Sequence, residues 1–135
     1  MIKASELMIG DWVRVRLPWH CPVDGHTEIR WYTHRVTGVQ TYGPDADTIY
    51  IEAAGVLPRD IEPLPLTPEI LEKNGWDPIT YKIEGAENVH CRPMVVAKDY
   101  VVFEVSCGWG AYPVVFVHQL QHLLRLFEID KEIEL

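Results

Sequence analysis

The stretch IGDWVRVRL, residues 9–17, decides the fold of the first half of this chain. From Trp12 to Leu17 every second side chain is aliphatic, and the side chains between them are large and polar or aromatic. The aliphatic set is Val13, Val15 and Leu17, and the other set is Trp12, Arg14 and Arg16. Side chains of an extended chain point alternately to its two sides, so this pattern predicts a β-strand with one face on a core and one in solvent.

The residues that follow predict further strands separated by turns. Residues 28–39 and 48–52 are rich in β-branched and aromatic residues, which is typical of strands. Pro18 and the segment Pro22–Gly25 predict a long loop before the second strand. Several short strands after a Gly-Asp-Trp-Val start favour an SH3-like small β-barrel over residues 1–63, with a single antiparallel meander as the alternative.

The second half, residues 64–135, is predicted to be an α+β lobe that packs with the first as one unit. Thr67 is a good N-cap residue, and Pro68 suits the first position of a helix. Gly75 can adopt the left-handed conformation that ends a helix. We therefore expect a short helix over residues 68–74.

Antiparallel strands and a C-terminal helix complete the predicted lobe. We expect the strands at 79–83, 92–97, 100–105 and 111–117, with a tight turn between the second and third. Apolar residues then recur at helical spacing, which predicts a helix over about 117–127. The fold class predicted for the whole chain is α+β.

Composition restricts the class of function. The chain has 135 residues, a formal net charge of -8 and three cysteines. The charge disfavours nucleic-acid binding, and the odd, small number of cysteines fits a reducing compartment. No apolar stretch approaches the ~20 residues that span a bilayer, and no phosphate-binding glycine motif occurs. We expect a cytoplasmic protein without a cofactor and without membrane contact.

Four potential metal ligands occur in the predicted loop and in the strand after it: His20, Cys21, His26 and His34. Imidazole and thiolate are the donors that zinc prefers. Only His20 and Cys21 are close in sequence, and adjacent side chains of an extended chain point apart. A metal-binding protein or enzyme that uses this cluster is therefore an alternative hypothesis, and an exposed loop that contains histidines is the simpler interpretation.

No catalytic residue is predicted. His118 and His122 lie four apart on the predicted C-terminal helix, the spacing with which two imidazoles bind one zinc ion in zinc proteases. Those enzymes need a glutamate base next to the first histidine, and Gln119 stands there instead. We interpret the two histidines as part of the polar face of a helix.

Exposed aromatic residues and arginines are common at binding surfaces. Glycines on both sides of Trp109 predict a pliable loop that leaves this side chain accessible. We expect partner-binding residues at six positions: Arg14, Arg16, Trp19, Trp31, Trp109 and Tyr112. Packing of the tryptophans in the core is the alternative.

Four arginines of the first third offer a further hypothesis, in which one face of the barrel binds nucleic acid. They are Arg14, Arg16, Arg30 and Arg35. Such a surface predicts binding that weakens steeply with salt.

Three blocks, residues 2–13, 61–75 and 117–121, occur in this order along the chain. Together they resemble a family of short uncharacterised proteins of gut Bacteroidales that are often associated with phages or other mobile elements. The resemblance implies no activity and no catalytic residue. The hypothesis we favour is a non-enzymatic protein-interaction or assembly module encoded by a mobile element or prophage. A homo-oligomer is compatible with it, because edge strands of small barrels pair readily.

Overall fold

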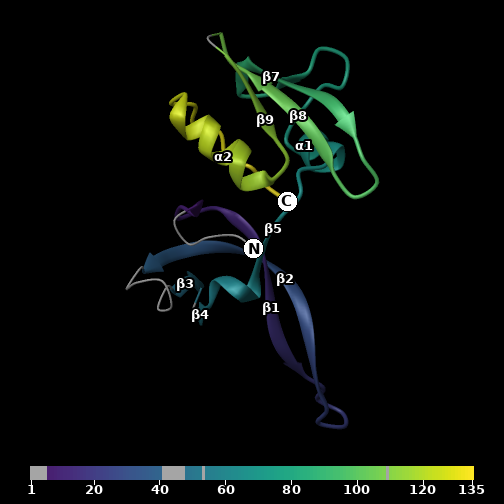
Figure 1. The fold of residues 1–135 in the computed structure, drawn as a ribbon, viewed down its shortest axis with the longest axis vertical. Helices are drawn as coiled ribbons and strands as arrows, with labels where there is room; N and C mark the ends of the chain where they lie inside the picture. The colour runs from purple at the N-terminus through teal and green to yellow at the C-terminus, as the bar shows by residue number, and fades with distance from the viewer. Residues whose placement is uncertain (1–5, 41–47, 53, 109) are drawn as a thin grey trace. The chain divides into compact units, whose positions relative to one another are not determined.

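A computed structural model of the chain describes residues 6–40, 48–52, 54–108 and 110–135. The chain divides into two compact units, Met1–Leu64 and Pro65–Leu135. Each unit is built on one antiparallel sheet, and both α-helices belong to the second unit (Figure 1). The predicted α+β class is therefore confirmed.

The sheet of the first unit has five strands in the order β4-β3-β2-β1-β5. The strands are β1 (Trp12–His20), β2 (Thr27–Gln40), β3 (Thr48–Ile51), β4 (Ala54–Val56) and β5 (Ile61–Pro63). One turn of 3-10 helix, η2 (Pro58–Asp60), lies between β4 and β5. The first unit therefore consists of short strands around the long β1–β2 pair.

The core of the first unit confirms the alternation that the sequence shows. Val13 and Val15 of β1 are fully buried, together with Ile49 of β3. Asp11 is buried as well, and its carboxylate accepts a hydrogen bond from the Met8 amide at 2.8 Å. This bond closes the turn before β1 and fixes which face of β1 points into the core.

Two expectations for the first unit need correction. In the described residues β4 and β5 are the two edges of the sheet and do not pair, so no closed barrel is shown. The predicted long loop after Pro18 is also wrong, because β1 continues to His20 and β2 begins at Thr27. The connection is a tight turn of six residues, 21–26.

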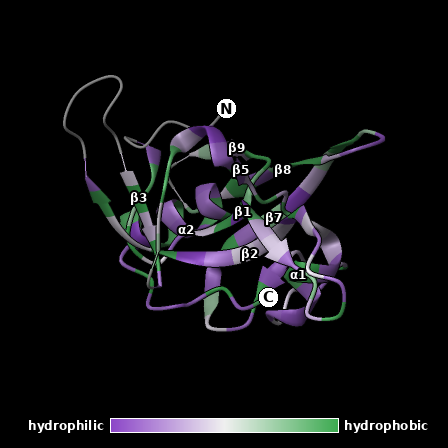
Figure 2. Cartoon of the chain, turned by 90° about the horizontal axis from the view of Figure 1, so that it is seen from below, coloured by the Kyte–Doolittle hydropathy of each residue, from purple (hydrophilic) through white to green (hydrophobic). Residues whose placement is uncertain are grey.

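The sheet of the second unit has four strands in the order β6-β7-β8-β9. They are β6 (Lys82–Ile83), β7 (Ala86–Val96), β8 (Val101–Ser106) and β9 (Ala111–Val114). The two helices are α1 (Pro68–Lys73) and α2 (Val117–Leu126). Each helix carries both hydrophilic and hydrophobic residues (Figure 2).

The predicted ends of the short helix are confirmed. The Thr67 hydroxyl accepts a hydrogen bond from the Ile70 amide at 3.2 Å, as expected of an N-cap. Gly75 has a φ of +87°, and the Trp76 amide donates to the Leu71 carbonyl at 3.0 Å. The turn after α1 therefore folds the chain back, and Trp76 is buried.

The last residues of the chain are bound to the end of α1. The Asn74 side chain donates to the Glu134 carbonyl at 2.7 Å and accepts from the Glu134 amide at 2.8 Å. Ile133 next to it is 1% exposed. The C-terminal segment is therefore part of the core of the second unit. No helix in the described part of the chain is long and apolar enough to cross a membrane.

Candidate functional site

Strands β1 and β2 extend beyond the other strands of their sheet. They pair from Trp12↔Arg35 to His20↔Thr27, whereas β5 pairs with β1 only at Val13–Val15. Strand β3 pairs with β2 only from Val36 onward. Residues 16–31, from the Arg16↔Trp31 pair to the turn, therefore form a two-stranded hairpin, here called the arm, with no third strand on either edge among the described residues (Figure 1).

Cross-strand register gathers arginines and tryptophans on one face at the base of the arm. The guanidinium of Arg35 lies 4.6 Å from the ring centre of Trp12, directly across the pair. The guanidinium of Arg14 lies 5.3 Å from the ring centre of Trp31, on the diagonal. Both distances are those of cation–π pairs. We call these four residues together with Arg16 the Arg–Trp face.

The Arg–Trp face is accessible, and part of its charge is balanced by nearby carboxylates. Trp31 is 38% exposed, and the side chain of Arg14 is 39% exposed. Arg16 binds the Asp60 carboxylate at 2.8 Å, and Arg14 lies 3.7 Å from that of Glu62. The face therefore has a modest positive charge, with flat guanidinium and indole groups held in fixed positions.

Trp19 does not belong to this face. The Trp19 side chain points to the opposite side of β1 from those of Arg16 and Pro18. On that side of the arm its ring centre lies 3.5 Å from the Arg30 guanidinium. The His26 ring packs against it edge-on, at 5.8 Å between centres. Trp19 and Trp31, both expected to bind a partner, are therefore on opposite sides of the same hairpin.

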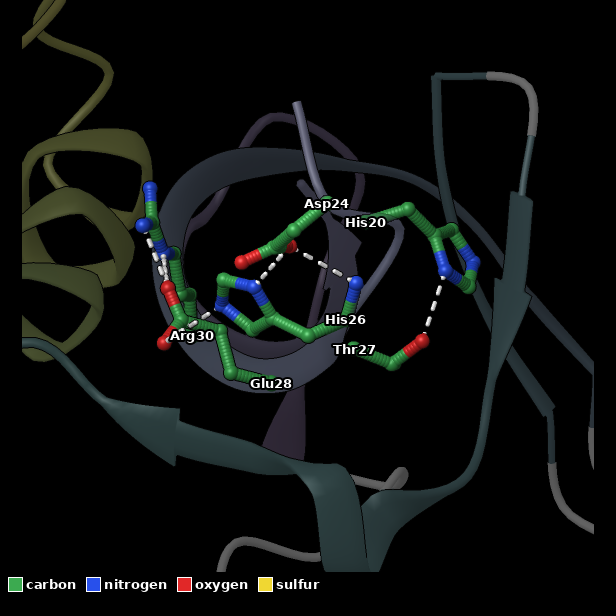
Figure 3. Close-up of polar contacts among 6 residues, drawn as sticks. All are labelled: His20, Asp24, His26, Thr27, Glu28 and Arg30. Carbon is green, nitrogen blue, oxygen red and sulfur yellow. Dashed lines mark hydrogen bonds and ion pairs between the residues drawn. The ribbon is translucent and has the colours of Figure 1, made fainter. Parts of the chain in front are cut away.

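The turn at the end of the arm gathers three side chains with metal-binding atoms. Ligand atoms of Cys21, Asp24 and His26 all lie within 4.8 Å of one another. Asp24 accepts a hydrogen bond from the His26 amide at 2.9 Å and a second one from the His26 ring (Figure 3). These bonds, with one from the Cys21 thiol, lower the pKa of Asp24.

The structure does not bring all four predicted metal ligands together. His20 points away from the turn and bonds the Thr27 hydroxyl at 2.8 Å (Figure 3). His34 pairs with Val13, seven positions from the His20–Thr27 pair, which corresponds to about 23 Å along a strand. Asp24, which sequence reasoning did not include, is the third donor. The spacing Asp-x-His, which allows both side chains to meet across a glycine turn, was the available signal.

The remaining predicted site residues lie in the second unit or outside the described residues. Trp109 falls outside the part of the chain that the structure describes. Tyr112 is on β9, 41% exposed, with its ring 6.0 Å from that of Phe127. The two predicted partner-binding segments therefore belong to different units.

Two side chains of the second unit that sequence reasoning weighed for catalysis have structural positions. Cys91 is buried, and burial raises the pKa of its thiol to about 12. The Gln119 side chain accepts hydrogen bonds from the amides of Val115 and Phe116, at 2.8 and 3.0 Å. It therefore caps helix α2, which explains a glutamine where a zinc protease would need a base.

A pocket in the second unit has a volume of about 500 Å³. It is lined by Lys82, Glu87, Asn88, His90, Cys107 and Gly108. Its lining contains both a basic and an acidic side chain, and we assign no ligand and no reaction to it.

No protein family matches the chain, and neither do any curated proteins or solved structures. The residues of the arm are therefore interpreted from their own geometry.

Proposed function

We propose that this protein is a non-enzymatic protein-interaction module and that the β1–β2 arm with its Arg–Trp face makes the contact. The observation that carries the proposal is the pairing of Arg14 with Trp31 and of Arg35 with Trp12 on an accessible face. Tryptophan and arginine contribute most often to the binding energy of protein interfaces. The buried core cluster of the first unit consists of leucine, valine and isoleucine and includes neither tryptophan nor arginine.

An SH3-like scaffold for the first unit is part of the proposal. A long β1–β2 hairpin, two short strands and one turn of 3-10 helix before the last strand follow one another in the order typical of that fold. The strand order β4-β3-β2-β1-β5 supports it too. Such scaffolds carry many unrelated functions, so the scaffold alone does not select the partner.

We propose an extended acidic polypeptide segment as the partner. The open edges of β1 at residues 16–20 and of β2 at residues 27–35 offer unpaired strand positions to which an extended segment can add. Carboxylates of that segment would bind the guanidinium groups of Arg14 and Arg35, and its apolar side chains would contact Trp31 and Ile29, which is 59% exposed. A two-stranded hairpin is marginally stable alone, so a third strand would also stabilise the arm.

Nucleic acid is the less favoured partner of the same face. Asp60 and Glu62 beside Arg16 and Arg14 leave the face with too little positive charge for a continuous row of phosphates, whereas a peptide needs only one or two carboxylates to pair with it. A net charge of -8 further opposes a phosphate backbone. The resemblance to proteins associated with phages and mobile elements fits an assembly or host-contact role for a protein-binding module, and we include that role in the proposal.

Selection from a displayed library of extended peptides tests this function. The wild-type chain is the bait, and Trp31→Ala is used for counter-selection, so that only peptides that need the Arg–Trp face remain. We expect the remaining peptides to be rich in Asp and Glu next to apolar residues. Binding of the chain to single-stranded DNA and RNA oligonucleotides is measured in parallel. Sedimentation of the free chain shows whether it is a dimer. Tight oligonucleotide binding without peptide enrichment, or a dimer that masks the face, would contradict the proposal.

A further inference from the structure

The turn at the end of the arm combines three kinds of metal-binding atom. Cys21 offers a sulfur, Asp24 a carboxylate oxygen and His26 a ring nitrogen, and these atoms lie within 4.8 Å of one another. In a tetrahedral zinc site with bonds of about 2.0–2.3 Å, neighbouring ligand atoms are about 3.5 Å apart. Small side-chain rotations would therefore bring the three atoms onto one ion.

Backbone hydrogen bonds fix the turn in the conformation that gathers these side chains. The Cys21 amide donates to the His26 carbonyl at 2.8 Å, and the Gly25 amide donates to the Cys21 carbonyl at 3.0 Å. Gly25 has a φ of +77°, which a residue with a Cβ rarely adopts. Because the backbone is already closed into a turn, little backbone entropy remains to be lost on metal binding.

The two ring nitrogens of His26 face two different carboxylates. Its Nδ1 faces Asp24, and its Nε2 lies 3.8 Å from a carboxylate oxygen of Glu28 (Figure 3). Glu28 is itself held by Arg30, whose Nε donates to it at 2.6 Å. A carboxylate on the far nitrogen of a ligating histidine fixes the ring and raises its basicity. An ion bound at Nδ1 would replace the present contact between the His26 ring and Asp24.

We infer that the end of the arm binds a zinc-class divalent cation through Cys21, Asp24 and His26, with Glu28 orienting the histidine. The inference is independent of the proposed partner. Thiolate and imidazole select zinc over calcium and magnesium, which prefer oxygen ligands. Three protein ligands leave a fourth position for water or for a donor from another molecule. His20 and His34 are not ligands of this site.

Metal binding to the full-length chain, purified without an affinity tag and kept reduced, tests the inference. Zinc affinity is measured by competition with a chromophoric chelator, and cobalt is used as a spectroscopic substitute. We expect one ion per chain, and a cobalt complex with the charge-transfer band of a thiolate ligand. Absence of saturable zinc binding, or a cobalt spectrum without that band, would overturn the inference.

Matched variants distinguish this site from other histidines and thiols. Cys21→Ser and His26→Asn remove ligands and should weaken zinc binding by at least about tenfold, while Glu28→Gln should weaken it less. His20→Asn and Cys107→Ser are the controls, and their zinc affinity should equal that of the wild type. Far-UV circular dichroism checks that each variant is folded. Equal zinc affinity of Cys21→Ser and the wild type, or equal losses in His20→Asn and His26→Asn, would show that the ion binds elsewhere.

Discussion

The three cysteines differ in how accessible their sulfur atoms are. Cys21 and Cys107 are partly exposed, whereas Cys91 is 0% exposed, between β6 and β8 in the core of the second unit. Burial raises the pKa of Cys91 to about 12, so the reactive thiolate form is rare near neutral pH. A thiol reagent should therefore modify two cysteines quickly and the third only after unfolding.

Quantitative thiol titration with and without denaturant measures this difference. Cys91→Ser should leave the fast phase unchanged and remove the slow one. Three thiols that react equally fast in the native protein would contradict the burial of Cys91.

The Asp77 carboxylate should become protonated at low pH, and its hydrogen bond to a backbone amide allows this protonation to be measured. Its side chain accepts a hydrogen bond from the Ile79 amide at 2.8 Å, and this bond lowers the pKa of Asp77 below the ordinary value of 3.8. At pH values above the pKa that Asp77 has in the unfolded chain, the bond therefore stabilises the turn before β6. This stabilisation is lost as the pH falls through the lower pKa of Asp77 in the folded protein.

The NMR shift of the Ile79 amide should titrate with Asp77, with a midpoint below 3.8. Asp77→Asn should abolish this titration. A midpoint at or above 3.8 would show that the hydrogen bond is absent.

The burial of a single residue was predictable where it depends only on the residue's own strand. The alternation of Val13, Val15 and the residues between them gave the correct buried face of β1. The pairing of Arg14 with Trp31 was not predictable, because it depends on the register between two strands, and that register is set by the length of the turn at 21–26. Sequence reasoning took that turn to be a long loop.

Among the elements, the C-terminal segment and helix α1 stabilise each other. Ile133 is almost fully buried, and the Asn74 side chain makes two hydrogen bonds to the backbone of Glu134. Truncation of a buried isoleucine to alanine costs about 2–5 kcal/mol. Ile133→Ala should therefore destabilise the second unit by an amount in this range, and Asn74→Ala should destabilise it by about 1–3 kcal/mol.

Chemical denaturation measures both effects. Leu126→Ala is the matched control, because Leu126 is 69% exposed at the end of α2 and its truncation should cost less than about 0.5 kcal/mol. Equal stabilities of Ile133→Ala and Leu126→Ala would contradict the docking of the C-terminal segment.

At the scale of elements, helix ends were easier to predict than the length of the first hairpin. Thr67 acts through its hydroxyl on an amide three residues on, and Pro68 and Gly75 act through their own backbone angles, so their effects can be predicted from the local sequence. Pro18 was misleading because a proline usually ends a strand. In this structure it lies in β1 beyond the residues that β5 covers, where a missing amide on a sheet edge costs little.

For the whole molecule, the α+β class followed from the sequence, but the arm did not. The arm exists because β1 and β2 are longer than the strands that flank them, and strand length is a property of pairing that no single segment encodes. The end of the arm then brought Asp24 rather than His34 to Cys21 and His26. The meeting of Asp24 with His26 is local to the turn and had a signal in the Asp-x-His spacing, whereas the separation of His34 from the turn depends on strand pairing.

We propose that the Arg–Trp face binds an acidic extended segment. The most direct test is the Kd of a peptide selected on the wild-type chain, measured for Trp31→Ala, Arg14→Ala and the control Thr33→Ala. Thr33 is exposed and pairs with Arg14 across the same hairpin but belongs to no cation–π pair described here. We expect Trp31→Ala and Arg14→Ala to weaken binding by about tenfold or more, because both residues are central to the face, and Thr33→Ala to bind like the wild type. Equal affinities of Trp31→Ala and the wild type would contradict it.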